Sequence, residues 1–418
     1  MKGSQSNDIL SLTGVRFLAV LMIFLFHYSN KLSFTGAPVI GILNQFFLGV
    51  QVFFVLSGFV ICYQYFENTE IKKEFFYTYY LRRFARIYPS FFLLTTFTFS
   101  VWYFKTEIDS SFWKLYLLNI TFVKGLSVEY YLSGIGPTWS LTVEGIFYLF
   151  SPFIFLFFKQ KKILWWQVIF WWAIGGILVV LFSAFPFEGF FENVQFVYFV
   201  TFFGRCFEFY LGIFLALCIL GKYKWQTSIL PKLSFPFYTA AGFLGMALIT
   251  IFIYKVSQLY DTEASKTFAG IFLTNILFPL SVSLFFFGLI KETSIIQKLF
   301  SSFLLQLLGK SSYAFFLIHT GVIATGVEKY LSRNIIILFI TLQILAIFLY
   351  KIFENPVNKW IRWKGETLIK QSSLFDKIWM SAFKTFRIGP DFFKWRVGDF
   401  GIGVVLWNKT IPDTGITK

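Results

Sequence analysis

The sequence predicts an all-α, polytopic membrane protein with about ten transmembrane helices in one bundle. Of its 418 residues, 57% are apolar and only 14% are charged, whereas a soluble domain is roughly 45–50% apolar and about 25% charged. Phe alone contributes 62 residues, and a soluble fold would expose much of that surface as large apolar patches. The apolar runs are long and unbroken, unlike the alternating ~10-residue strands of a transmembrane barrel. The composition therefore excludes a soluble enzyme, a disordered chain and a coiled coil.

Ten segments have the ~20 mostly apolar residues that a transmembrane helix needs. They are 12–29, 42–64, 87–104, 139–158, 163–185, 196–220, 236–254, 268–290, 311–327 and 334–353. The first does not read as a signal peptide, because it carries Arg16 and His27 and lacks a small-x-small cleavage site.

The loops between these segments predict the orientation. On the side of the N-terminus lie 19 basic residues: Lys2, Lys72, Lys73, Arg82, Arg83, Arg86, Lys159, Lys161, Lys162, Lys222, Lys224, Lys232, Lys291, Lys298, Lys310, Lys351, Lys359, Arg362 and Lys364. The opposite side carries 8, namely Lys31, Lys105, Lys114, Lys124, Lys255, Lys266, Lys329 and Arg333. Cytoplasmic loops carry the excess of Lys and Arg, so we expect a multi-pass protein of the inner (plasma) membrane with both termini in the cytoplasm. The net charge of +16 then reflects topology and not nucleic-acid binding.

We expect two parts along the chain: a membrane domain, residues 1–364, and a cytosolic tail, residues 365–418. In the tail, Trp379, Phe383 and Phe386 alternate with basic residues. That pattern fits either an amphipathic helix on the membrane surface or a low-complexity linker.

Groups that exchange protons near neutral pH are scarce, because the chain has two histidines, His27 and His319. His319 lies in the middle of the ninth segment, where we expect a hydrogen-bonded core residue with a supporting role. Cys62, Cys206 and Cys218 all lie in apolar runs. Their spacing predicts neither a disulfide framework nor a metal site.

Ionisable side chains inside a span cost roughly 2.5–3.5 kcal/mol each on insertion scales, so each is a functional hypothesis. Arg16 and His27 are 11 residues apart in the first segment, which is about 16 Å and about three turns of one helix. Arg16 either snorkels at the cytosolic end or serves a site, and His27 is either an interfacial residue or a catalytic one. Glu144 is expected at about the depth of His27, where it either orients the imidazole or partners another polar group.

Three more arginines, Arg82, Arg83 and Arg86, lie at the cytosolic end of the third segment. They either anchor the topology or bind phosphate, because guanidinium groups match phosphate geometry. Near the middle of the sixth segment, Arg205 and Glu208 have the i, i+3 spacing of an ion pair. We expect this pair to play a supporting, structural role.

Several short motifs follow one another in a characteristic order. They are Arg16 with His27, residues 53–59 reading Phe-Phe-Val-Leu-Ser-Gly-Phe, Arg82-Arg83 with Arg86-Ile87-Tyr88-Pro89, Trp139-Ser140-Leu141 with Glu144, Arg205 with Glu208 and Gly212, Ser312-Tyr313 with His319, and Glu354-Asn355-Pro356. From about residue 8 to 360 the chain therefore resembles the acyltransferase-3 family of integral-membrane O-acyltransferases. Phe316 stands where the family has a second tyrosine.

The resemblance implies a reaction. The donor substrate would be cytosolic acyl-CoA, acetyl-CoA in particular, with no permanently bound cofactor, and the acceptor a hydroxyl of a glycan or exported saccharide. Arg16, Arg82, Arg83 and Arg86 would bind the donor. His27 would act as general base, with Glu144 as its catalytic partner, or would carry the acyl group itself as an acyl-imidazole.

Two other classes of function remain open at this stage. A transporter or flippase for a saccharide or anionic solute also has central charges, although transporters usually contain paired repeats and broken spans in matching places, and we see neither. A scaffold without chemistry would leave the His, Glu and Arg residues inside the membrane unexplained.

Overall fold

The computed structural model describes residues 10–104, 111–222, 236–263 and 266–369. Within these ranges every regular element is a helix, and an isolated bridge between Ser127 and Phe190 is the one β-type pairing. The predicted all-α fold is confirmed. The chain divides into two compact units, Met1–Arg362 and Trp363–Lys418. Of the second unit, residues 363–369 are described and are helical, and the pattern expected around Trp379 to Phe386 lies outside the described residues.

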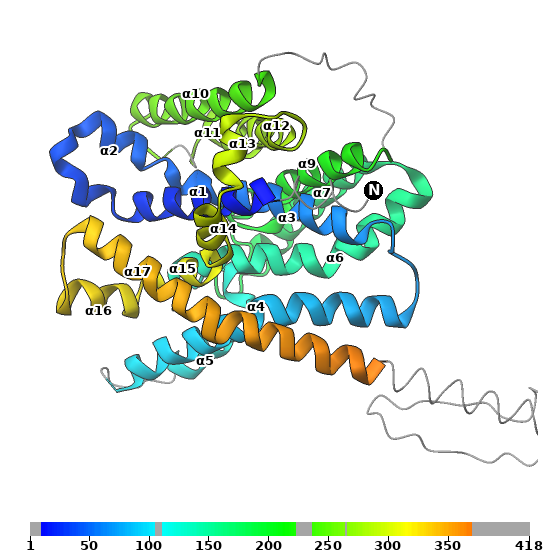
Figure 1. Ribbon diagram of the computed structural model, residues 1–418, viewed down its shortest axis with the longest axis horizontal. Helices are drawn as coiled ribbons and strands as arrows, with labels where there is room; N and C mark the ends of the chain where they lie inside the picture. The colour runs from blue at the N-terminus through cyan, green and yellow to red at the C-terminus, as the bar shows by residue number, and fades with distance from the viewer. Residues whose placement is uncertain (1–9, 105–110, 223–235, 264–265, 370–418) are drawn as a thin grey trace, which may run out of the picture. The chain divides into compact units, whose positions relative to one another are not determined.

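Figure 1 shows the helices of the first unit. The α-helices are α1 (Leu10–His27), α2 (Ala37–Leu43), α3 (Gly49–Tyr65), α4 (Lys73–Tyr103), α5 (Ser111–Ile120), α6 (Trp139–Lys161), α7 (Leu164–Ala184), α8 (Val194–Val200), α9 (Phe202–Ile219), α10 (Phe237–Leu259), α11 (Phe268–Phe272), α12 (Phe278–Lys291), α13 (Ile295–Phe300), α14 (Phe303–Lys310), α15 (Ser312–Ile318), α16 (Val322–Tyr330) and α17 (Ile335–Leu349). Short 3₁₀ turns are η1 (Ser29–Thr35), η2 (Phe46–Leu48), η3 (Val123–Leu126) and η4 (Gly136–Thr138), and π-turns are η6 (Leu273–Leu277) and η7 (Tyr350–Glu354).

Eight helical segments in the described part of the chain are long and apolar enough to cross a membrane. They are Leu10–His27, Ala37–Tyr65, Gly136–Lys161, Leu164–Ala184, Val194–Ile219, Phe237–Leu259, Phe268–Lys291 and Ile335–Ile369. The protein is thus a polytopic membrane protein. The expected segment 87–104 is the second half of α4, a helix of 31 residues whose first half is much more polar.

The expected segment 311–327 is not one helix but two, because the chain turns between α15 and α16. Gly321 has φ +76°, a left-handed conformation that side-chain-bearing residues rarely adopt. The break leaves His319 at the C-terminal end of α15, where its side chain is not wrapped by a further helical turn.

Helices α3 and α9 pack closely against each other in the core. A methyl carbon at Gly58 would lie 2.1 Å from the carbonyl oxygen of Phe209, and one at Gly212 would lie 2.1 Å from that of Val55. Small residues let membrane helices approach until their backbones touch. This contact fixes the rotation of α3 and so decides where Ser57 points.

Helix α1 lies near the centre of this unit, packed against α3 and α14 (Figure 1). Helix α4 contacts η7, and α15 contacts both α1 and α4. Residues of α1, α4, α15 and η7 therefore lie close together, although more than 300 positions separate α1 from η7 in the sequence.

Candidate functional site

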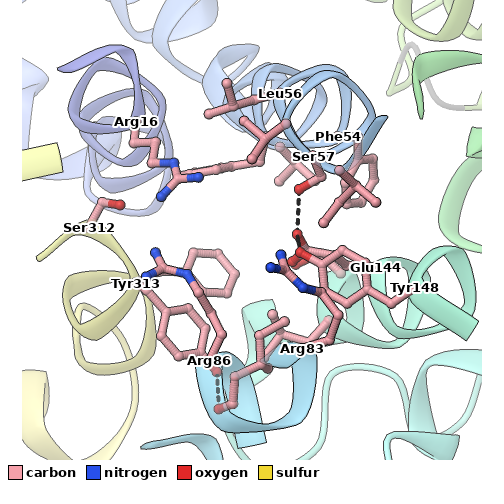
Figure 2. Close-up of a pocket in the computed structure, with 18 residues that line it drawn as sticks. Arg16, Phe54, Leu56, Ser57, Arg83, Arg86, Glu144, Tyr148, Ser312 and Tyr313 are labelled. Atoms are coloured by element: carbon pink, nitrogen blue, oxygen red, sulfur yellow. Dashed lines mark hydrogen bonds between the residues drawn. The ribbon is translucent and has the colours of Figure 1, made fainter. Parts of the chain in front are cut away.

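A small cavity of about 90 Å³ lies among α1, α3, α4, α6 and α15, and we call it the Glu144 cavity. Figure 2 shows Arg16 reaching it from α1, Arg83 and Arg86 from α4, and Glu144 from α6. Its 18 lining residues are Arg16, Val50, Phe53, Phe54, Leu56, Ser57, Val60, Ile61, Arg83, Arg86, Ile87, Ser140, Leu141, Glu144, Tyr148, Ser312, Tyr313 and Phe316.

Glu144 is the central acceptor of this cavity. Its Oε1 accepts hydrogen bonds from the hydroxyls of Ser57 and Tyr148 (Figure 2). The Arg83 guanidinium lies 5.7 Å from the centre of the Tyr148 ring, and its Nη2 donates to Tyr65 Oη at 3.0 Å. Glu144 thus compensates part of a positive cluster in a low-dielectric environment.

A second carboxylate approaches the same cluster from η7. Glu354 is 3% exposed, and its Oε1 lies 3.9 Å from Arg86 Nη1. Neither carboxylate oxygen has a hydrogen-bond partner among the described residues. The π-turn turns this side chain inward, and such turns occur frequently at functional sites.

A wider cavity of about 260 Å³, the arginine cavity, shares Arg16, Arg83 and Arg86 with the Glu144 cavity. Its lining also includes Arg82 and Arg362, and no carboxylate is among the described residues that line it. The structure therefore brings together all four arginines that the sequence suggested for a donor site.

Sequence reasoning missed two residues of the arginine cavity. Arg362 counted only toward topology, and Asn358, one turn before it, was not considered. The available signal was the position of both residues soon after Glu354-Asn355-Pro356, on the helical residues 355–362. A side chain two turns beyond a site residue lies near the same face of a helix.

The two histidines form an imidazole pair at the opposite end of α1. His27 is the last residue of α1 and is exposed, whereas His319 is 1% exposed. Their ring centroids are 5.2 Å apart, with 53° between the ring planes. The hydroxyl of Tyr28 donates to the carbonyl oxygen of His319 at 2.9 Å, which ties the end of α1 to the end of α15.

The sequence left two roles open for Glu144: to orient the His27 imidazole or to partner another polar group. In the structure Glu144 contacts other polar groups and not His27. The hydrogen bonds of Glu144 join it to Ser57 and Tyr148, and the ring contacts of His27 are with Phe26 and His319. Depth within a span was a poor guide here, because the rotation of α6 and the attraction of the arginines decide which neighbour Glu144 faces.

Phe316 links the two regions. It lines the Glu144 cavity, its ring centroid lies 6.5 Å from that of Phe53, and it lies 5.7 Å from the His319 ring. This aromatic side chain therefore stands between the cavity and the imidazole pair.

Arg205 and Glu208 form the expected ion pair. Arg205 Nη1 donates to Glu208 Oε1 at 2.7 Å and to Asn275 Oδ1 at 3.1 Å, and Arg205 Nε donates to the carbonyl oxygen of Phe199 at 2.6 Å. Both side chains are at most 1% exposed and neither lines the Glu144 cavity or the arginine cavity. The ion pair therefore forms as expected, and its structural role stays a prediction.

Comparison with known proteins gives one family and several distant relatives. The model of a family described as an acyltransferase domain matches residues 9–353. The acyltransferase MdmB of Streptomyces mycarofaciens is 30% identical over 37% of this chain and 42% of its own length. The peptidoglycan O-acetyltransferase OatA of Listeria monocytogenes is 24% identical over 84% of this chain and 56% of its own length.

The chain thus spans about half the length of the curated relatives that it matches. No solved structure shows a significant match to it.

Proposed function

Because this chain belongs to the acyltransferase family whose domain covers residues 9–353, we propose that it is a membrane O-acyltransferase. It moves an acyl group, acetyl in particular, from cytosolic acyl-CoA to a hydroxyl of a glycan or saccharide. The observation that carries the proposal is the arrangement of three parts in one bundle: the arginine cavity, the small Glu144 cavity that shares its arginines, and the exposed His27 beyond Phe316.

The donor binds at the arginine cavity. Five arginines without a lining carboxylate favour a ligand with several negative charges, and guanidinium groups bind phosphate oxygens in pairs. Coenzyme A carries such phosphates on a long, thin arm. With the phosphates held near Arg16, the arm has about 16 Å of helix to follow to reach His27.

The size of the Glu144 cavity favours a short acyl group. The cavity has a volume of about 90 Å³, and the aromatic rings of Phe53, Phe54 and Phe316 are part of its lining. An acetyl thioester fits such a space, whereas a long acyl chain requires these rings to move.

The acceptor meets His27 from the exposed side of α1. As the hydroxyl oxygen attacks the thioester carbonyl, His27 takes its proton, the new ester C–O bond forms, and the C–S bond breaks. The coenzyme A thiolate leaves and receives the proton. General-base catalysis of this kind contributes about 10²–10⁴-fold. In the alternative route the imidazole attacks first and carries the acyl group itself.

A glycan is the acceptor class that the relatives support. One of them is named for the O-acetylation of peptidoglycan, and the exposure of His27 leaves room for a bulky acceptor. In this orientation, both termini are cytoplasmic and His27 faces the outer side. Reporter fusions test this: a fusion at residue 120 should read outside, and fusions at 160 and 365 inside.

The function is tested by release of the coenzyme A thiol from acetyl-CoA by purified protein in lipid nanodiscs, with candidate saccharides as acceptors. Wild type should release thiol only when an acceptor is present. His27→Ala should lose at least about 10²-fold in kcat and keep its donor affinity. Asn30→Ala, an exposed polar change three residues away, is the matched control and should behave as wild type.

Transfer by His27→Ala within about tenfold of the wild-type rate would remove His27 as the base. Trapping of a hydroxylamine-sensitive acyl-protein in wild type would select the acyl-imidazole route.

A further inference from the structure

The hydrogen bond at one nitrogen of His319 fixes the state of the other. His319 Nδ1 lies 2.8 Å from the carbonyl oxygen of Phe316. A carbonyl oxygen only accepts, so Nδ1 carries the hydrogen. In a neutral imidazole the second nitrogen then has a free lone pair. Nε2 of His319 is therefore an acceptor.

This acceptor is buried and unused. His319 is 1% exposed, and Nε2 has no partner among the described residues. A buried acceptor left unpaired costs about 1–3 kcal/mol, and such a group in a folded protein requires an explanation. The His319 ring stacks on Phe315 with the centroids 5.9 Å apart and 9° between the ring planes, and the Tyr28 hydroxyl donates to the backbone carbonyl of His319. These contacts hold the side chain in place, so the cost persists.

The neighbour across from this ring is His27. A centroid separation of 5.2 Å brings the two imidazoles within reach of an N–H···N hydrogen bond after a small side-chain rotation. Hydrogen bonds between catalytic groups are often long in the unliganded state and tighten when substrate is bound.

We propose that His319 is the positioning residue of the transferase reaction. Its Nε2 accepts the N–H of His27, so that the other nitrogen of His27 presents a lone pair to the acceptor hydroxyl. This inference rests on the proposed function and assigns to His319 the role that the sequence suggested for Glu144.

The proton path follows from this chain of contacts. The acceptor O–H gives its proton to one nitrogen of His27, and the opposite N–H of His27 stays bonded to His319 Nε2. The resulting imidazolium is stabilised by that bond, and His319 is in turn held by the Phe316 carbonyl. No proton needs to reach His319. Next to Tyr28, Lys31 and Glu328 form an ion pair at 2.7 Å.

Two substitutions at one position separate orientation from packing. In His319→Asn the amide N–H replaces Nδ1 toward Phe316, and no atom occupies the place of Nε2. In His319→Gln an amide oxygen reaches the place of Nε2. A misplaced catalytic group costs about 10²-fold, so His319→Asn should lose about 10²-fold in kcat, whereas His319→Gln should stay within about tenfold of wild type.

A readout that packing does not move is the pH–rate profile. Without the acceptor at His319, the imidazolium of His27 is less stabilised, and the acid limb of the profile of His319→Asn should shift to lower pH. The KM for acetyl-CoA should not change. Leu317→Ala, a buried packing change on the same helix, is the control and should lower thermal stability while keeping the wild-type profile.

Equal rates for His319→Asn and His319→Gln, or a His319→Asn profile that matches that of Leu317→Ala, would overturn the inference. The outcome is separable from failure of the proposed function. If His27→Ala is inactive while His319→Asn is fully active, His27 keeps its role and only the assignment of His319 fails.

Discussion

The arginine cavity and the imidazole pair share helix α1 and differ in nearly every physical property. Helix α1 carries Arg16 to one and His27 to the other, and α15 carries Tyr313 to the Glu144 cavity and ends at His319. The first region is crowded with guanidinium groups, whereas the second contains two aromatic bases, one of them exposed. Because one helix carries both residues, α1 fixes the distance between Arg16 in the arginine cavity and His27 in the imidazole pair.

The two regions also differ in their charge. At the two cavities, Glu144 and Glu354 lie close to the arginines and offset part of their charge. At the imidazole pair, a single acceptor at His319 stays without a partner. A charge in a low-dielectric interior requires compensation, whereas one neutral acceptor without a partner costs only about 1–3 kcal/mol of folding free energy.

The largest expected effect is on donor binding at the arginine cavity, which should change without a change in acceptor binding. Arg83→Met and Arg86→Met should each raise the KM for acetyl-CoA by about tenfold or more, since a hydrogen bond to a charged group contributes about 1.5–3 kcal/mol. Both arginines line both cavities. Steady-state kinetics with varied donor measures the effect, and the acceptor KM should remain unchanged.

Arg82→Met is the internal comparison for these variants, because Arg82 lines only the arginine cavity, and its effect should be smaller. Arg86→Lys should restore affinity only in part. If the donor KM equals that of wild type in all these variants, the arginines only anchor the topology, and the arginine cavity is not a donor site.

Glu144→Gln tests whether the carboxylate belongs to chemistry or to the cavity. It keeps the volume and removes the negative charge that faces Ser57 and Tyr148. We expect kcat to fall by about tenfold, less than for His27→Ala, since a general base contributes about 10²–10⁴-fold. A loss as large as that of His27→Ala, with a changed pH–rate profile, would place Glu144 with the imidazole pair instead.

Phe316→Ala probes the boundary between the regions. Removing this ring enlarges the Glu144 cavity on the side of His319. One methylene in an apolar pocket changes specificity by about 1–3 kcal/mol, so the rate with butyryl-CoA relative to acetyl-CoA should rise by about tenfold. Phe54→Leu, a milder change at another ring that lines the cavity, is the control. An unchanged ratio would mean that another part of the chain sets acyl length.

The smallest effect concerns a buried cation outside both regions. Lys124 in η3 is 1% exposed and donates to the carbonyl oxygens of Ser133 and Ile135. Burial lowers the pKa of Lys124 from 10.5 to about 7. In the unfolded chain the amine therefore binds a proton between about pH 7 and 10.5 that the folded chain releases, so folding stability rises with pH across this window.

Lys124→Met removes this dependence. The difference in unfolding temperature between wild type and the variant should grow by a few degrees from pH 7 to pH 9, because about 1 kcal/mol shifts Tm by roughly 2–4 °C in domains of 150–250 residues. Thermal unfolding in nanodiscs at pH 7, 8 and 9 measures it. A constant difference across the range would show that the amine keeps its proton inside the fold.

The sequence was a good guide to where an ionisable residue lies along its helix, and a poor guide to the direction in which its side chain faces. Hydropathy and charge placed Arg16 and Arg83 at one end of their helices, and the structure brings both into one cavity. Glu144 was assigned a depth but faced another partner, since the azimuth of α6 depends on tertiary packing that a single helix does not encode.

His319 shows the other limit of sequence reasoning. A histidine inside an apolar run reads as a core residue, and it is indeed buried. Its neighbour is 292 positions away in the chain, and the turn at Gly321 that ends α15 beside it gave no distinct pattern within a segment that otherwise looks like one span.

The residues that line the arginine cavity are synthesised at different times. Its walls come from α1, which leaves the ribosome early, and from Asn358 and Arg362, which follow more than 300 residues later. During membrane insertion the early arginines are present without the late helix that closes their cavity. A nascent chain that stops before α17 therefore lacks the Asn358 and Arg362 side of this cavity, so the cavity can form only after these residues have been synthesised.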